Sequence, residues 1–91
     1  MALIVRAVTL ADGVAKKIAT TGFGDPVVLQ NLSSVALYIG GDNTVAAANG
    51  FKLNTALLVN SEINLLNYAG EIWGFVAGAA GDVRVIECIS G

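Results

Sequence analysis

Histidine is absent from the 91-residue sequence, and cysteine and proline each occur once. Without histidine, the chain lacks the most common general base, and the single Cys88 lacks the partner that usually activates a thiol. A lone cysteine cannot close a disulfide within the chain, and in an apolar segment such as 82–89 it usually packs as a small hydrophobic side chain. The sequence therefore predicts that the protein is not an enzyme and holds no cofactor.

Long apolar runs are also missing. The longest stretch without a polar side chain, 72–80, contains two glycines and is far shorter than the about 20 residues of a membrane-spanning helix. The N-terminal MALIVRA has no basic segment before its apolar residues, and Arg6 interrupts them early, unlike a secretory signal. We therefore expect a protein that is made in the cytoplasm and is not secreted.

Charged side chains are scarce, with five basic and seven acidic residues. A globular chain of this mass keeps roughly 5,000 Å² of surface in water, which leaves about one charge per 400 Å² and is sparse for a free monomer. One explanation is a surface solvated by neutral polar groups, since seven asparagines and five threonines are present. The explanation that we favour is a surface partly covered by copies of the same chain or by another protein.

The charge balance argues against two classes of partner. The net charge is −2, and Lys16-Lys17 is the only pair of adjacent basic residues. Nucleic acids and anionic membranes both require a basic patch, and a solvated strand face explains Lys16-Lys17 better. We expect neither nucleic acid nor a membrane as a partner.

The sequence consists of short apolar segments separated by turn residues, at the spacing of an all-β domain. Residues 56–66 alternate between apolar and polar for most of their length, which favours a strand over the helix that competes for 55–67. Residues 1–91 are predicted to form a single small antiparallel β-sandwich or barrel, jelly-roll-like or immunoglobulin-like, with about eight short strands. The expected strands cover 3–10, 14–20, 26–32, 35–40, 51–53, 56–66, 71–77 and 82–89, with 44–48 as a weaker candidate.

Turn residues mark the ends of these strands. Asp-Gly between two apolar runs predicts a hairpin that joins 3–10 to 14–20. Asn-Gly before 51–53 predicts a type I′ turn, and two adjacent glycines predict a turn after 35–40. The expected turn-forming residues are Asp12, Gly13, Gly40, Gly41, Asn49 and Gly50.

None of the polar clusters has the composition of a known chemical site. The segment 40–43 lacks the Gly-Lys-Ser/Thr of a phosphate-binding loop. Asp42 and its neighbour Asn43 offer oxygens to Ca²⁺, but six to eight ligands are needed and no second acidic cluster adjoins them. Glu62, Glu71 and Glu87 lie on separate predicted strands, where solvent-facing positions explain them better than a catalytic pair. We expect no metal site and no catalytic site.

Aromatic side chains are few, with three phenylalanines, two tyrosines and one tryptophan. They are too few for the aromatic platform of a carbohydrate-binding module. Alternation along 71–77 places Trp73 and Phe75 on one face of the strand. A single tryptophan is more often a core side chain than an interface anchor, and both roles stay open for Trp73. The residues expected at an interface are Leu3, Val5, Tyr38, Trp73 and Phe75.

The segments between 27 and 89 follow a recognisable order: a strand, Asn-x-Ser, a strand ending in Gly-Gly, an Asn-Gly turn, an aromatic strand and a final Val-Arg-Val strand. The order is carried by VLQNLSS at 28–34, VALYIGG at 35–41, NGFKL at 49–53, IWGFVA at 72–77 and DVRV at 82–85. In this order the chain resembles a small β-rich domain that is common in proteins of tailed bacteriophage particles.

The resemblance implies a structural virion protein similar to capsid decoration, or cement, proteins. Such a protein is expected to form a homo-oligomer, with a trimer favoured, on the outer capsid surface. It would bind the major capsid protein across capsomer junctions and stabilise the phage head. The first 25 residues lie outside the resemblance, and we expect residues 1–10 to serve as a docking or edge strand. One alternative is a tail or head-fibre component that binds a receptor through the loops 21–26 and 40–44. Another is a cellular β-sandwich that binds a ligand.

Overall fold

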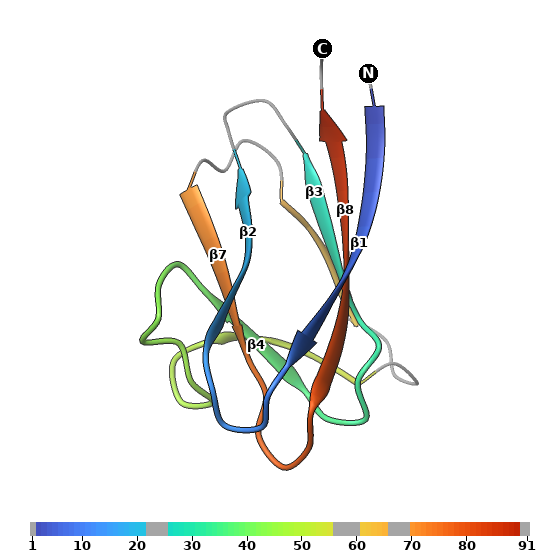
Figure 1. Ribbon diagram of the computed structural model, residues 1–91. Coiled ribbons are helices and arrows are strands. Elements are labelled where there is room, and N and C mark those ends of the chain that lie inside the picture. Colours follow the sequence, from blue (N-terminus) through green and yellow to red (C-terminus); the bar gives the residue numbers. More distant parts are fainter. Residues whose placement is uncertain (1, 22–25, 56–60, 66–69, 90–91) are drawn as a thin grey trace.

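The computed structural model describes residues 2–21, 26–55, 61–65 and 70–89, and these residues contain eight β-strands and no helix (Figure 1). Each strand coincides with one of the apolar segments of the sequence. The strands are β1 (Ala2–Leu10), β2 (Lys16–Thr21), β3 (Val27–Asn31), β4 (Leu37–Gly40), β5 (Phe51–Leu53), β6 (Glu62–Leu65), β7 (Gly70–Phe75) and β8 (Gly81–Ile89).

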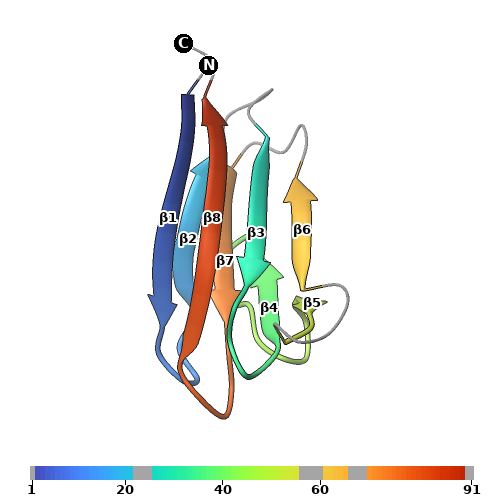
Figure 2. The same cartoon turned by 90° about the vertical axis from the view of Figure 1, so that its right-hand side faces the viewer.

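The strands form two four-stranded sheets that face each other (Figure 2). Sheet A has the order β1-β8-β3-β6, sheet B has the order β2-β7-β4-β5, and all neighbouring strands are antiparallel. The pairing is symmetric along the chain, because β1 pairs with β8, β2 with β7, β3 with β6 and β4 with β5. This is the order of a jelly roll, in which an antiparallel ribbon is rolled into a sandwich. The prediction of an all-β sandwich is confirmed, and its jelly-roll version is the one that forms.

The core lies between the sheets and receives alternate residues from each strand. In β3, for example, Val27, Leu29 and Asn31 are buried, whereas Val28 and Gln30 are partly exposed. The total accessible surface of 5017 Å² agrees with the surface expected from the mass. The buried apolar side chains are Val8, Leu10, Ile18, Ala19, Val27, Leu29, Leu37, Val45, Leu53, Ile72, Val76, Val83 and Val85.

The hairpin predicted at Asp12-Gly13 is wrong, because β1 and β2 belong to different sheets. The turn itself forms, with Gly13 at a φ of 76°, but it connects one sheet to the other. It packs against the turn between β7 and β8: the Gly13 N–H donates to the Val76 carbonyl at 2.8 Å, and the Asp12 carboxylate accepts from the Gly78 N–H at 2.8 Å. Asp-Gly thus predicts where the chain turns, but not which strand β1 pairs with.

The type I′ turn predicted at Asn49-Gly50 is also wrong, because Gly50 lacks the positive φ that this turn requires. Asn49 instead closes a loop with its side chain, accepting from the Ala46 N–H at 2.7 Å and donating to the Thr44 carbonyl at 3.0 Å. Gly50 is required by packing: a Cβ atom there would lie 2.6 Å from the Cβ atom of Tyr38.

The remaining differences concern strand ends. The predicted strands at 14–20 and 35–40 begin two residues later, and the weaker candidate 44–48 forms no strand. Gly40 is the last residue of β4, and Gly41 begins the bend that follows. Of the segment 55–67, for which a helix competed, the part from Glu62 to Leu65 is strand β6, whereas 56–60 and 66–67 lie outside the described residues.

A bulge in β2 accounts for the glycine in the middle of β7. The register of β2 on β7 shifts between Lys17 and Ala19, and both Ile18 and Ala19 are buried. A Cβ atom on Gly74 would lie 2.4 Å from the Cδ1 atom of Ile18. Gly74 therefore makes room for the extra inward-facing side chain of the bulge.

Candidate assembly interface

An apolar row crosses the outer face of sheet A. Val5, Ile86 and Val28 are register partners on β1, β8 and β3. Val28 lies between the buried Val27 and Leu29, and side chains of register partners lie on the same face of a sheet, so all three lie on the face away from the core. Leu3 extends the row along β1. Leu3 and Val5 are 67% and 58% exposed, so the edge of the sheet presents uncovered apolar surface of the kind found at protein interfaces.

Polar side chains border the apolar row on the side of the turn between β7 and β8. The next row across sheet A contains Arg84, Gln30 and Glu62, and Arg84 forms an ion pair with Asp82. Asn64 on β6 is the register partner of Val28, so the apolar row on β1, β8 and β3 has polar neighbours on two sides, which resembles the centre and rim of a protein interface.

An ion pair occupies the inner side of the same end of sheet A. Arg6 on β1 pairs with Glu87 on β8, and its guanidinium also donates to the Ile18 carbonyl on β2 at 3.4 Å. The side chains are 43% and 18% exposed, so the pair contributes little stability. It neutralises the one charged side chain of β1.

Three aromatic side chains lie on the outer face of sheet B, on the opposite side of the molecule from the apolar row. Tyr38 and Phe75 are register partners, and Trp73 lies two residues before Phe75 on β7. All three are partly buried, and the Trp73 indole N–H donates to Glu71 at 3.0 Å. Of the two roles left open for Trp73, the core role does not fit, because the side chain lies outside the buried cluster between the sheets. The five predicted interface residues separate into Leu3 and Val5 on one face and the aromatic trio on the other.

The loop after β4 is held by its own polar side chains. Asp42 accepts from the Thr44 N–H at 2.9 Å and from the Thr44 hydroxyl. The hydroxyl bond, followed by the backbone bond, lowers the pKa of Asp42 below its ordinary value. The carboxylate therefore holds the loop through two hydrogen bonds to Thr44.

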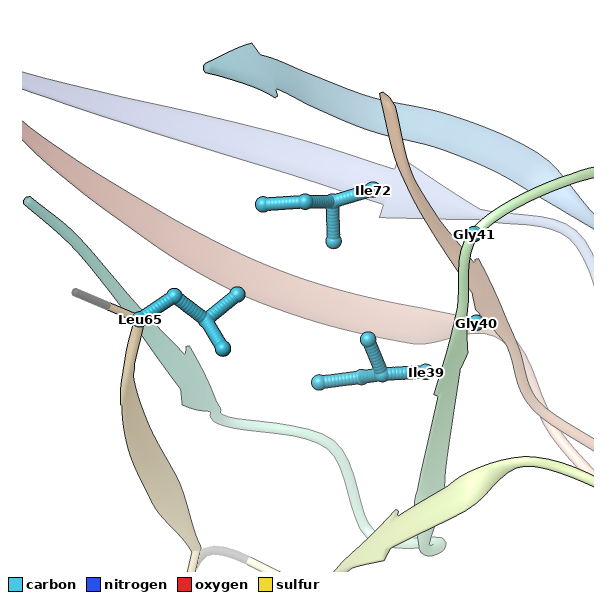
Figure 3. Close-up of a pocket in the computed structure, with 5 residues that line it drawn as sticks. All are labelled: Ile39, Gly40, Gly41, Leu65 and Ile72. Carbon is cyan, nitrogen blue, oxygen red and sulfur yellow. The ribbon is translucent and has the colours of Figure 1, made fainter. Parts of the chain in front are cut away.

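A cavity of about 240 Å³ opens between the sheets beside β6. Ile39, Leu65 and Ile72 point into it, and Gly40 and Gly41 line its end (Figure 3). These described lining residues offer no polar side chain, whereas ligand sites usually combine apolar walls with a few convergent polar groups. The cavity is therefore a weak candidate for a specific binding site.

The three glutamates of the sequence occupy different places. Glu62 lies on the outer face of sheet A, Glu71 on the outer face of sheet B, and Glu87 pairs with Arg6. In the part of the chain that the structure describes, no three acidic, cysteine or histidine side chains gather as for a metal ion. The same part contains no helix that could span a membrane.

Comparisons with protein-family models, with curated proteins and with solved structures gave no match to this chain. The apolar row therefore has to be interpreted from its own geometry. Sequence reasoning found Leu3 and Val5 but missed Ile86 and Val28, because only the order of strands in sheet A makes them neighbours of Val5.

Proposed function

We propose that this protein is a structural component of a bacteriophage particle, a capsid decoration protein on the outer surface of the head. In this proposal it associates with itself and binds the major capsid protein across junctions between capsomers. The observation that carries the proposal is the apolar row of Leu3, Val5, Ile86 and Val28 on a chain with few charges. Leu3 and Val5 are exposed, and Ile86 and Val28 are partly exposed. The jelly-roll order supports it by analogy, since this architecture is frequent in viral capsid domains.

The physical advantage of such a protein is multivalency. An oligomer that bridges several capsid subunits gains effective concentration from each contact already made, so modest contacts add up to tight binding. Because it binds the assembled shell and not the separated subunits, it stabilises the shell by mass action. An apolar patch with a polar border suits this role, since it buries its centre and keeps its rim hydrated.

The test is binding to heads of the encoding phage assembled without this protein. We expect the purified chain to co-sediment with heads up to a fixed number of copies per head and to raise their melting temperature. A Val5→Glu variant is expected to lose binding, whereas Val14→Glu keeps it, because Val14 is similarly exposed at 54% but lies away from the row.

Two outcomes would overturn the proposal. Absence of the chain from sedimented heads would exclude decoration, and binding to tails alone would move the protein to the tail. Equal binding by the two glutamate variants would show that the apolar row is not the contact surface.

A further inference from the structure

Each sheet has two edge strands, and three of the four carry features that discourage pairing with another strand. β2 has two lysines, Lys16 and Lys17, and a bulge at Ile18. β5 has three residues, including Lys52, and β6 has four. Short length, lysine and bulges are the usual protection of an exposed edge against association.

The edge of β1 lacks this protection over its first half. β1 has nine residues, and Leu3, Ile4 and Val5 are 67%, 38% and 58% exposed. Its only charged side chain, Arg6, is paired with Glu87 inside the same chain. Lys16 donates to the Thr9 carbonyl at 3.1 Å. This contact lies in the second half of β1 and leaves the first half of the edge exposed. In both ribbon views the start of β1 extends beyond the end of β2 (Figures 1 and 2).

We infer that residues 2–6 of β1 pair antiparallel with the same residues of a second copy of this chain. The inference rests on the proposed function, because it names the contact through which the protein associates with itself. Backbone pairing needs a partner with an extended segment or a free strand edge, and a second copy supplies such an edge with the same exposed apolar side chains. Antiparallel pairing of identical strands is two-fold symmetric, so the contact closes as a dimer. The two A sheets then join into one continuous sheet.

The distribution of side chains selects the register in which Ile4 faces Ile4 of the second copy. Leu3 then lies opposite Val5 of the second copy, and the apolar row of Val5, Ile86 and Val28 continues across the junction. The two Arg6 side chains are four residues apart along the strands, or roughly 14 Å, which exceeds the screening length of physiological salt. A register centred on Arg6 would instead place two like charges opposite each other, which is unfavourable.

The net charge of −2 per chain permits this contact, since two copies repel each other weakly. A single strand pair is small compared with the roughly 800 Å² per partner of a standard interface. The dimer is therefore expected to depend on concentration. The trimer implied by the sequence resemblance differs from this inference in copy number, and the solution mass separates the two.

The register is tested by cysteine cross-linking in a Cys88→Ser background. Residues opposite each other in an antiparallel pair lie about 4.5–5.5 Å apart, within the range for a disulfide. Ile4→Cys is therefore expected to form a covalent dimer under mild oxidation at least tenfold faster than Ala7→Cys. Ala7 is also exposed on β1, but its equivalent would be roughly 20 Å away.

Equal rates for the two cysteine variants, or no covalent dimer from either, would overturn the inference. Sedimentation of Val5→Lys and Val14→Lys gives a second measurement without oxidation, with loss of the dimer expected only for Val5→Lys. If the wild-type chain binds heads but Ile4→Cys forms no covalent dimer, the strand pairing is rejected and the proposed function is kept. If Ile4→Cys forms the covalent dimer but the wild-type chain does not bind heads, the proposed function is rejected and the strand pairing is kept.

Discussion

Two buried polar side chains, Asn31 and Ser33, fix the crossing from sheet A to sheet B. Asn31 is fully buried, donates to the carbonyls of Val35 and Asn54 at 3.0 and 2.9 Å, and accepts from the Ser33 N–H. The Ser33 hydroxyl accepts from the Asp82 N–H at 2.8 Å. These bonds satisfy backbone groups that the crossing removes from the strand ladders, so the core tolerates two polar residues.

We expect Asn31→Leu to lower the free energy of unfolding by about 3 kcal/mol, because it removes the three hydrogen bonds that this fully buried amide makes to backbone groups. Urea denaturation followed by the fluorescence of the single tryptophan measures the change. Asn64→Ala, at an exposed position of β6, is the control and should stay within about 0.5 kcal/mol of the wild type. Similar losses in both variants would show that the buried amide has no special role.

The loop after β4 gives a pH-dependent prediction. The pKa of Asp42 is lowered by the Thr44 hydroxyl and then by the Thr44 backbone N–H. A lowered pKa means that the loop is stabilised above the ordinary pKa of an aspartate and loses this contribution as the pH falls through the folded-state value. We expect Thr44→Val to raise the pKa of Asp42 toward its ordinary value and Thr44→Ser to leave it low. A carboxyl NMR titration that gave the same pKa in both variants would contradict this.

At the scale of the element, β1 serves two purposes at its two ends. Val8 and Leu10 at its C-terminal end are buried in the core, whereas Leu3 and Val5 at its N-terminal end are exposed. The same strand therefore contributes to folding through one half and is available for association through the other.

The two halves respond differently to truncation of a leucine. We expect Leu10→Ala to cost about 2–5 kcal/mol of unfolding free energy, since it leaves a cavity in a closed core. Leu3→Ala should cost less than about 0.5 kcal/mol when measured at a concentration where the chain is monomeric. Comparable costs would mean that the start of β1 is packed and not free.

The strands themselves were largely predictable, because alternation and turn residues are local properties of the sequence. The pairing was not, because it joins the first strand to the last and depends on contacts remote along the chain. Asp12-Gly13 illustrates the limit: the turn was predicted correctly and the hairpin was not. The same holds for the site, where Leu3 and Val5 were found from β1 alone, whereas Ile86 and Val28 join them through strand order.

At the scale of the whole molecule, a chain with few charges folds into two sheets that each expose an outer face. One face of each sheet is buried in the core. The outer face of sheet A still carries apolar residues, among them Leu3 and Val5, that nothing in the described chain covers. The proposed burial of this surface in an assembly would account for both the composition and the unprotected edge of β1.

Sedimentation velocity of the purified chain over a wide concentration range tests this self-association most directly. We expect the mass to rise from 9.3 kDa toward twice that value, and Val14→Lys to behave in the same way. A mass approaching three times the monomer would keep self-association but reject the strand pair. A single 9.3 kDa species at every concentration would contradict self-association through sheet A.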